Sequence, residues 1–332
     1  MPEAVKNIET KNCPYCGSVE VIKKGIRKNK LQAVQVYFCN DCSKKFTDGR
    51  FKNKSYSNLQ IIKALSQYNL GHTLAEVSKK QGIPASTLAN WLIEYRELFN
   101  LMKQAPKVRK YAQQAPLIEY YKYHHLIVYF YRQHSYKIEN TVKIDMPGLF
   151  DYFAKVKAGK INKNLFTNNL TRASNLKLNI YKNLKIRCVQ NNACSFAAMA
   201  LELVNSNRKR HNMVESIMLE NDNATLAIEL PVSLNLRQST IPWLKNLKSE
   251  SGWLTGHIDV LQYRNGKLYI LDFKPEAEKE KPIGQLFAYA CCLSKATGVS
   301  FKQMKLAWFD EKVYYEVDTM DVYINVMSIF KK

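Results

Sequence analysis

The fold of the last third of the chain is decided by residues 253–275, which read WLTGHIDVLQYRNGKLYILDFKP. Two largely apolar runs flank residues 264–267, and the Asn-Gly pair there suits the positive φ angles of a tight hairpin turn. We therefore expect two antiparallel strands that bring Asp259 and Asp272 together. Side chains alternate along a strand, so Asp272 and Lys274 should share one face.

Two carboxylates and an ammonium group that converge at a strand end suit a divalent-metal hydrolytic site. Mg²⁺ prefers oxygen ligands, and Asp259, Asp272 and the backbone carbonyl of Phe273 could supply them. The ion, Mg²⁺ or Mn²⁺, would activate a water molecule and stabilise charge on a phosphate group. Lys274 would orient or deprotonate that water, so the stretch predicts hydrolysis of a phosphate ester.

The segments around the hairpin predict an alternation of helices and strands. The expected elements are a helical stretch at 195–220, a strand at 225–231, an amphipathic helix at 283–294, and strands at 305–309 and 313–317. Together with the hairpin, they give the order helix, three strands, helix, strand.

Three short motifs within this order resemble the PD-(D/E)xK nuclease superfamily, and within it the RecB-like branch. Gly256-His-Ile-Asp259 matches the first acidic motif, and Asp272-Phe-Lys274 matches the (D/E)xK motif. Gln285-Leu-Phe-Ala-Tyr289 matches the Q-x-x-x-Y helix of the RecB-like branch. The sequence departs from the superfamily pattern at Ile258, which stands in the proline position of the first motif.

The resemblance implies a restriction-endonuclease-like αβββαβ core within residues 191–332 and roles for several side chains. The ligand sphere of the metal would be completed by His211 or Glu215, which lie one helical turn apart. Gln285 would orient the lysine or a phosphate, and Tyr289 would pack in the core or contact DNA.

Two residues near the motifs are interpreted less specifically. Glu229, on the strand expected before the hairpin, is either a third acid or a structural residue. His257 is expected to point to the face opposite Asp259.

The N-terminal part contains two C-x-x-C pairs, Cys13 with Cys16 and Cys39 with Cys42. Four thiolates from two such knuckles make a closed tetrahedral site, so residues 1–52 are predicted to form a structural zinc ribbon. Residues 19–23 and 34–38 alternate like two strands around a turn expected at 25–30. Basic residues expected on or near this turn are candidate DNA contacts: Lys24, Arg27 and Lys28.

Residues 55–105 are typical of a helix-turn-helix domain. In that motif the third helix enters the major groove with its N-terminal residues, which here would be Ser86, Thr87 and Asn90. A purely structural three-helix bundle is the alternative. A zinc ribbon followed by a helix-turn-helix resembles the DNA-binding end of insertion-sequence transposases, which implies recognition of a defined DNA sequence.

Residues 106–190 form a basic middle region with a strongly aromatic segment at 117–131. We expect a pair of strands that contributes to a hydrophobic core. Interleaved aromatic and cationic side chains also suit stacking of a single nucleic-acid strand, which is the alternative.

Charge indicates the class of partner. The 332 residues contain 50 Lys and Arg against 28 Asp and Glu, a formal net charge of +22, whereas residues 211–332 hold 14 basic and 15 acidic side chains. An excess of this size favours a polyanion, most simply double-stranded DNA. The sequence offers no apolar stretch of membrane-spanning length and no secretory signal, so a cytoplasmic or nucleoid-associated protein is expected.

The sequence thus predicts a multidomain α+β protein that cuts DNA with Mg²⁺ or Mn²⁺, guided by a zinc-ribbon and helix-turn-helix head. The resemblance at the N-terminus suggests a mobile-element setting, with a homodimer or a partner recombinase as further partners. The alternatives are a RecB-like exonuclease or repair nuclease, and a DNA-binding regulator with an inactive nuclease-like domain.

Overall fold

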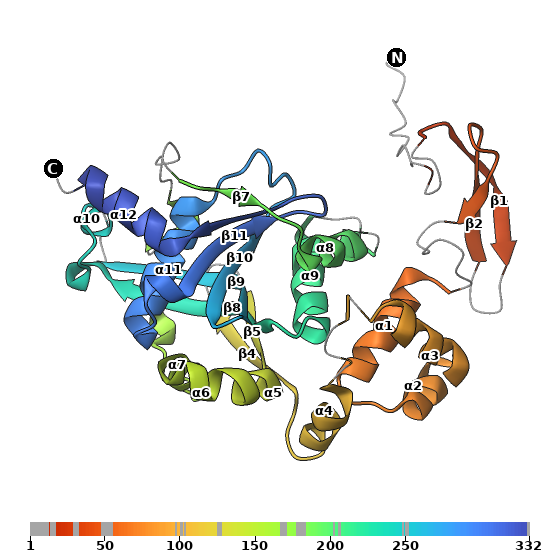
Figure 1. Cartoon of the computed structure of the whole chain (residues 1–332), viewed down its shortest axis with the longest axis horizontal. Helices are drawn as coiled ribbons and strands as arrows, with labels where there is room; N and C mark the ends of the chain where they lie inside the picture. Colours follow the sequence, from red (N-terminus) through yellow and green to blue (C-terminus); the bar gives the residue numbers. More distant parts are fainter. Residues whose placement is uncertain are drawn as a thin grey trace. The chain divides into compact units, whose positions relative to one another are not determined.

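The structure is a computed structural model. It describes residues 13, 18–28, 33–47, 56–96, 98–99, 102, 104–124, 128–166, 171–176, 184–201, 203–204, 207–247, 249 and 252–330. The chain is mixed α+β and divides into two compact units, Met1–Lys63 and Ala64–Lys332 (Figure 1). Among the described residues, no helix combines the length and the apolar character needed to cross a bilayer.

The first unit contains an antiparallel three-stranded sheet in the order β1-β2-β3. Its strands are β1 (Val21–Lys28), β2 (Ala33–Cys39) and β3 (Lys45–Thr47). The prediction of a turn at residues 25–30 places its start too early, because β1 continues to Lys28. Gly25 instead lies at a shift in the β1–β2 register, with a φ of +92°, a conformation that glycine adopts without strain.

Short helices follow this sheet along the chain, close to where the sequence predicts them. They are α1 (Asn58–Asn69), which crosses the boundary between the units, α2 (Leu74–Gln81), α3 (Ala85–Glu94) and α4 (Ala105–Ala112). Thr73 and Glu76 form a reciprocal capping box at the start of α2, and Gly82 ends this helix in the left-handed conformation.

A nine-stranded sheet forms the framework of the second unit. Its main path runs β4 (Ile118–His124), β5 (Val128–His134), β8 (Thr225–Asn235), β9 (Trp253–Arg264), β10 (Lys267–Phe273), β11 (Met304–Phe309), β12 (Tyr314–Asp318) and β7 (Arg187–Cys188). The short β6 (Thr171–Arg172) pairs with β9. β10 and β11 are parallel, whereas the other neighbours on the path are antiparallel.

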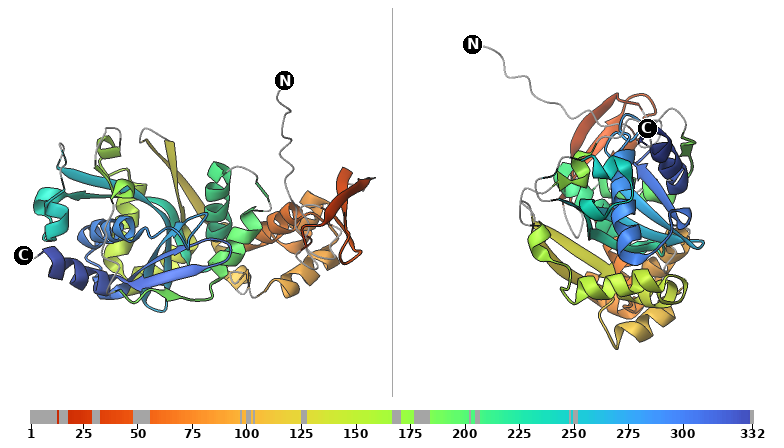
Figure 2. Two further views of the ribbon diagram at one scale, coloured as in Figure 1. Left: turned by 90° about the horizontal axis from the view of Figure 1, so that it is seen from above. Right: turned by 90° about the vertical axis from the view of Figure 1, so that its left-hand side faces the viewer.

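Helices surround this sheet (Figure 2). The longer ones are α7 (Pro147–Lys157), α8 (Asn192–Leu201), α9 (Asn207–Asn221), α11 (Ile283–Thr297) and α12 (Thr319–Phe330). Of these, α9, α11 and α12 contact the strands of the sheet, whereas α7 packs on α11 and α8 packs on α9. The short segments are α5 (Ser135–Lys137), η2 (Ile138–Val142), α6 (Lys143–Asp145), η3 (Lys163–Phe166), η4 (Ala173–Asn175), η5 (Leu236–Gln238), α10 (Pro242–Lys245) and η6 (Phe301–Gln303). α11 is buried from Ile283 to Leu293, because it lies against β8, β10 and β11 and also contacts α7. The chain order α9, β8, β9, β10, α11, β11 is the order of elements predicted from the sequence.

The middle region is continuous with this framework, and the sheet crosses the sequence boundary placed at residue 190. β5 pairs with β8, and the ammonium group of the buried Lys137 donates hydrogen bonds to the carbonyls of Leu219, Asp222 and Thr225. Three carbonyl acceptors match the three protons of an ammonium group. Lys137 therefore ties the middle region to the end of α9 and the start of β8.

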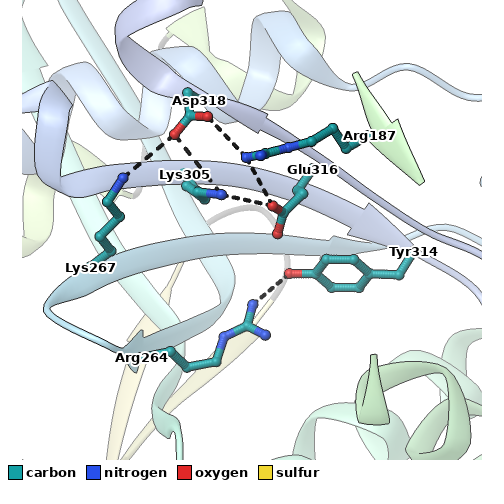
Figure 3. A network of polar contacts seen from close by, with 7 residues as sticks. All are labelled: Arg187, Arg264, Lys267, Lys305, Tyr314, Glu316 and Asp318. Atoms are coloured by element: carbon teal, nitrogen blue, oxygen red, sulfur yellow. Dashed lines mark hydrogen bonds and ion pairs between the residues drawn. The ribbon is translucent and has the colours of Figure 1, made fainter. Parts of the chain in front are cut away.

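An ion-pair network connects the strands at the edge of the sheet that ends in β12 and β7 (Figure 3). The Lys305 Nζ atom lies 2.7 Å from Glu316 Oε1, and both side chains are nearly buried. Arg187 on β7 contacts Glu316 at 3.2 Å and Asp318 at 3.1 Å, and Lys267 lies 3.8 Å from Asp318. These ion pairs link the four strands β7, β10, β11 and β12 to one another.

Candidate active site

A cavity of about 770 Å³ opens among α9, β5, β8, β9, β10 and α11. Four carboxylates line it: Glu215, Glu229, Asp259 and Asp272. The other polar residues predicted from the sequence motifs also reach it, namely His211, Lys274, Gln285 and Tyr289. The cavity thus gathers these acidic and cationic groups, which are up to 63 residues apart in the sequence, the separation of His211 and Lys274.

The hairpin places Asp259 and Asp272 side by side. Asn265 and Gly266 turn the chain with φ angles of 50° and 74°, and the Leu271–Val260 pair puts the two aspartates opposite each other at the next position. Burial, with the neighbouring charge of Asp259, raises the pKa of Asp272 well above its ordinary value. Asp272 therefore tends to keep its proton and donate a hydrogen bond to Asp259.

The charge of Asp259 is stabilised from α9. Burial alone would raise the pKa of Asp259, but the nearby His211 outweighs this effect, and the pKa falls below its ordinary value. His211 Nε2 lies 3.0 Å from Asp259 Oδ2 and 2.9 Å from Glu215 Oε1. Although burial opposes its charge, these two carboxylates raise the pKa of His211 to about 12. His211 and Glu215, the two residues of α9 predicted as alternative metal ligands, therefore both face the cavity.

Glu229 joins the same group of acids from β8. It lies between the Ile228–Val260 and Leu230–Ile258 pairs, opposite Asp259, and has a φ of 52° that non-glycine residues rarely adopt. Burial, with the charge of Glu215, raises its pKa well above the ordinary value. Ligand atoms of His211, Glu215 and Glu229 lie within 4.8 Å of one another.

Lys274 provides the ammonium group of the cavity. Its Nζ atom lies 3.0 Å from Asp272 Oδ2, and its backbone N–H donates to the carbonyl of Phe309, which fixes the chain just beyond β10. Burial lowers the pKa of Lys274, but Asp272 outweighs this effect and raises the pKa above its ordinary value. The lysine is therefore a proton donor and a fixed positive charge at neutral pH. The metal contact predicted for the carbonyl of Phe273 stays a prediction.

Gln285 and Tyr289 reach the cavity from α11, where the Gln285 side-chain amide donates a 3.2 Å hydrogen bond to the Tyr289 hydroxyl. Tyr289 points the edge of its ring at Gly256 on β9. A Cβ atom at residue 256 would stand 2.4 Å from the Tyr289 ring, so only glycine fits there without displacement. The glycine of the first motif therefore makes room for the tyrosine of the helix motif.

The structure also brings in residues that the sequence interpretation did not use. His257 lines the cavity with Asp259 and stacks on Tyr129 with ring centroids 4.2 Å apart, so the expectation that it points to the opposite face is wrong. Residues two apart on a strand share a face, and this alternation was the available signal. Arg132 and Arg172 line the cavity as well. No local pattern marks them, because they arrive through long-range pairing.

The N-terminal unit contains a three-cysteine cluster. Cys13, Cys39 and Cys42 place their sulfur atoms within 4.8 Å of one another, with the Cys13 and Cys42 sulfurs 3.5 Å apart. Such a cluster could bind a metal ion such as zinc. The predicted fourth ligand, Cys16, lies outside the described residues.

The predicted DNA contacts occupy two places. On β1, Lys24 lies 4.5 Å from the ring centre of Phe38 and Arg27 is exposed, whereas the side chain of Lys28 is outside the described part. On α3, Ser86 and Asn90 are exposed and Thr87 is half-buried. The opposite side of α3 is buried through Leu88 and Trp91.

Comparison with known proteins gave no matching family model, curated protein or solved structure.

The donor set of the cavity fits a divalent cation. Three of the four carboxylates, Glu215, Asp259 and Asp272, directly contact His211 or Lys274. Beyond their contacts with one another and with these cations, buried oxygens of Glu215, Glu229 and Asp272 have no hydrogen-bond donor among the described residues. Buried carboxylate oxygens in this state favour a hard cation with oxygen ligands.

Proposed function

We propose that this protein is a metal-dependent DNA nuclease of the PD-(D/E)xK type, in its RecB-like form. The observation that carries the proposal is the convergence of Asp259, Asp272, Glu215 and Lys274 on one cavity. Glu229, in the same cavity, adds a further acid to the motif residues. The element order and the parallel β10–β11 pair support the corresponding core fold.

A bound Mg²⁺ or Mn²⁺ ion would supply an activated water and stabilise charge on the phosphate. Asp259 and Asp272 are its proposed ligands, together with Glu215 or His211 from α9. Binding a cation beside these acids would favour loss of the Asp272 proton, and of the His211 proton where the imidazole is the ligand, because only a neutral imidazole binds a metal ion. Lys274, which holds its own proton, would orient the attacking water and stabilise negative charge on the phosphate. Gln285 and Tyr289 would position these groups from α11.

The proposed substrate is DNA because the chain is strongly basic and its N-terminal half has two candidate DNA-binding elements. The three-cysteine cluster fits a zinc ribbon if Cys16 is the fourth ligand. The exposed residues Ser86 and Asn90 on α3 fit a recognition helix. These elements would select the DNA, and the cavity of the second unit would cut it.

The test is cleavage of supercoiled plasmid and of linear single- and double-stranded DNA in Mg²⁺ or Mn²⁺. The wild type should nick or linearise closed circles, Lys274→Ala should not, and Lys302→Ala, which removes an exposed lysine, should behave as the wild type. Digestion from free ends alone would replace the endonuclease assignment with an exonuclease. Tight DNA binding without cleavage in any metal would favour a regulator.

A further inference from the structure

The β4–β5 hairpin has one face in the core and one exposed face. Antiparallel pairing sets Tyr120 opposite Arg132 and Lys122 opposite Phe130. Opposed residues share a face, and so do residues two apart on a strand. These four side chains, called here the hairpin face, therefore alternate aromatic and cationic groups on one surface.

The two faces of the hairpin differ in burial. On the inner face, Tyr131 is fully buried and its ring stacks on Tyr121 at 5.6 Å. On the hairpin face, Tyr120 is 62% exposed and Phe130 is 54% exposed. The core packing expected from the sequence thus accounts for the inner tyrosines, but it does not account for the two exposed rings.

The hairpin face leads into the cavity with the carboxylates. Tyr120, Phe130 and Arg132 line that cavity. Arg132 pairs across to Ile228, the residue before Glu229, and its Nη1 atom donates a 2.8 Å hydrogen bond to the Ser216 hydroxyl on α9. Arg132 is therefore held between the exposed rings and the acidic centre.

We propose that the hairpin face binds an unpaired single strand of DNA and leads it into the cavity. Tyr120 and Phe130 would stack on successive bases, while Lys122 and Arg132 would contact the phosphates between them. Exposed aromatic rings interleaved with cations are the usual means of binding single strands without sequence preference. In a duplex the base faces are covered by their neighbours, so the rings select unpaired nucleotides. This inference rests on the proposed nuclease function and specifies its substrate as single-stranded or locally unpaired DNA.

Binding can be measured apart from cleavage. Fluorescence anisotropy with a labelled oligothymidylate of about 12 nucleotides, in buffer without Mg²⁺ or Mn²⁺, reports on binding by the full-length protein in the absence of cleavage. Each ring that loses its stack should weaken binding about tenfold, so Tyr120→Ala/Phe130→Ala should bind the oligonucleotide about 100-fold more weakly. Binding to a duplex of the same length should change less than twofold.

Two variants serve as controls. Ile144→Ala removes an exposed apolar side chain on α6, 86% exposed, and should bind both DNAs as the wild type does. Phe130→Trp retains the stacking surface and should keep the affinity, and its added indole emission should be quenched when the oligonucleotide binds.

Unchanged single-strand affinity in the double variant would overturn the inference, as would an equal loss for single strand and duplex. An unquenched indole in Phe130→Trp at saturating oligonucleotide would overturn it as well. Lys274→Ala separates the two proposals, because it should abolish cleavage, while removing the two rings should cost as much single-strand affinity in the Lys274→Ala background as in the wild type. A wild type that binds through the rings but cuts no DNA would contradict the nuclease proposal and leave the binding surface in place.

Discussion

Replacing Asp272 by asparagine should stabilise the metal-free protein, although the residue lies in the proposed active site. The Asp272 side chain is 1% exposed, and among the described residues Lys274, at 3.0 Å, is the cation in contact with it. An amide removes the repulsion from Asp259 and the desolvation cost of a buried carboxylate, but weakens the Lys274 contact. Each unit by which folding raises the pKa of a carboxyl group costs about 1.4 kcal/mol of stability at neutral pH, so we expect a net gain of about 1–2 kcal/mol. In a unit of this size the Tm should rise by about 2–8 °C.

Calorimetry of EDTA-treated protein measures this gain. Asp151→Asn, a substitution at an exposed position of α7, is the matched control and should change stability by less than about 0.5 kcal/mol. Adding about 10 mM Mn²⁺ should raise the Tm of the wild type and of the control, because a ligand that binds the native state stabilises it. Asp272→Asn should show little of this shift. A metal-free Asp272→Asn protein less stable than the wild type would refute the argument from buried repulsion.

The stabilising effect of Asp272→Asn should depend on pH. The pKa of Asp272 is higher in the folded protein than its unfolded value of 3.8, because of burial and then the charge of Asp259. The folded state therefore holds the Asp272 proton more tightly than the unfolded state does. The stability that this proton gives the wild type is lost as the pH rises through the folded pKa. Without metal, the Tm advantage of Asp272→Asn should grow from about pH 5 to pH 8. A constant difference across this window would contradict the raised pKa.

Three further substitutions test other parts of the account. Gly256→Ala should lower the free energy of unfolding by about 1–3 kcal/mol in denaturation curves, because the added Cβ overlaps the Tyr289 ring. The same substitution should slow cleavage in the plasmid assay. Lys305→Met should lower the free energy of unfolding by about 2 kcal/mol, because the nearly buried Glu316 loses its closest cation. An unchanged urea midpoint would contradict this loss of stability. Cys39→Ser should lose the metal of the N-terminal unit, so a colorimetric zinc assay that still finds one ion per chain would rule out the ribbon site.

Much of the candidate site follows from local sequence. The Asn265-Gly266 turn fixes the pairing of β9 with β10, and that pairing alone brings Asp259 to Asp272. The ends of α2 are equally local, since Thr73 and Gly82 lie directly beside the helix they cap. Such short-range signals are readable because few alternative conformations compete with them.

Long-range pairing accounts for what the sequence did not disclose. Arg132 enters the cavity because β5 pairs with β8 nearly a hundred residues later, and no pattern near Arg132 announces this partner. Glu229 could be placed only once the β8–β9 register was known, since that register sets it opposite Asp259. The aromatic segment of the middle region was ambiguous for a different reason. Its alternating residues serve two purposes, core packing for Tyr131 and exposure for Phe130, and composition alone does not separate them.

The most direct test of the central claim is single-turnover cleavage of DNA after the protein has been stripped of metal and reconstituted with Mn²⁺. The wild type and Asp151→Asn should cut at the same rate. Asp259→Asn, which removes a proposed metal ligand, should cut at least about 100-fold more slowly, as expected when several kcal/mol of transition-state stabilisation are lost. Equal rates for Asp259→Asn and the wild type would show that the carboxylate cavity is not where the phosphodiester bond is broken.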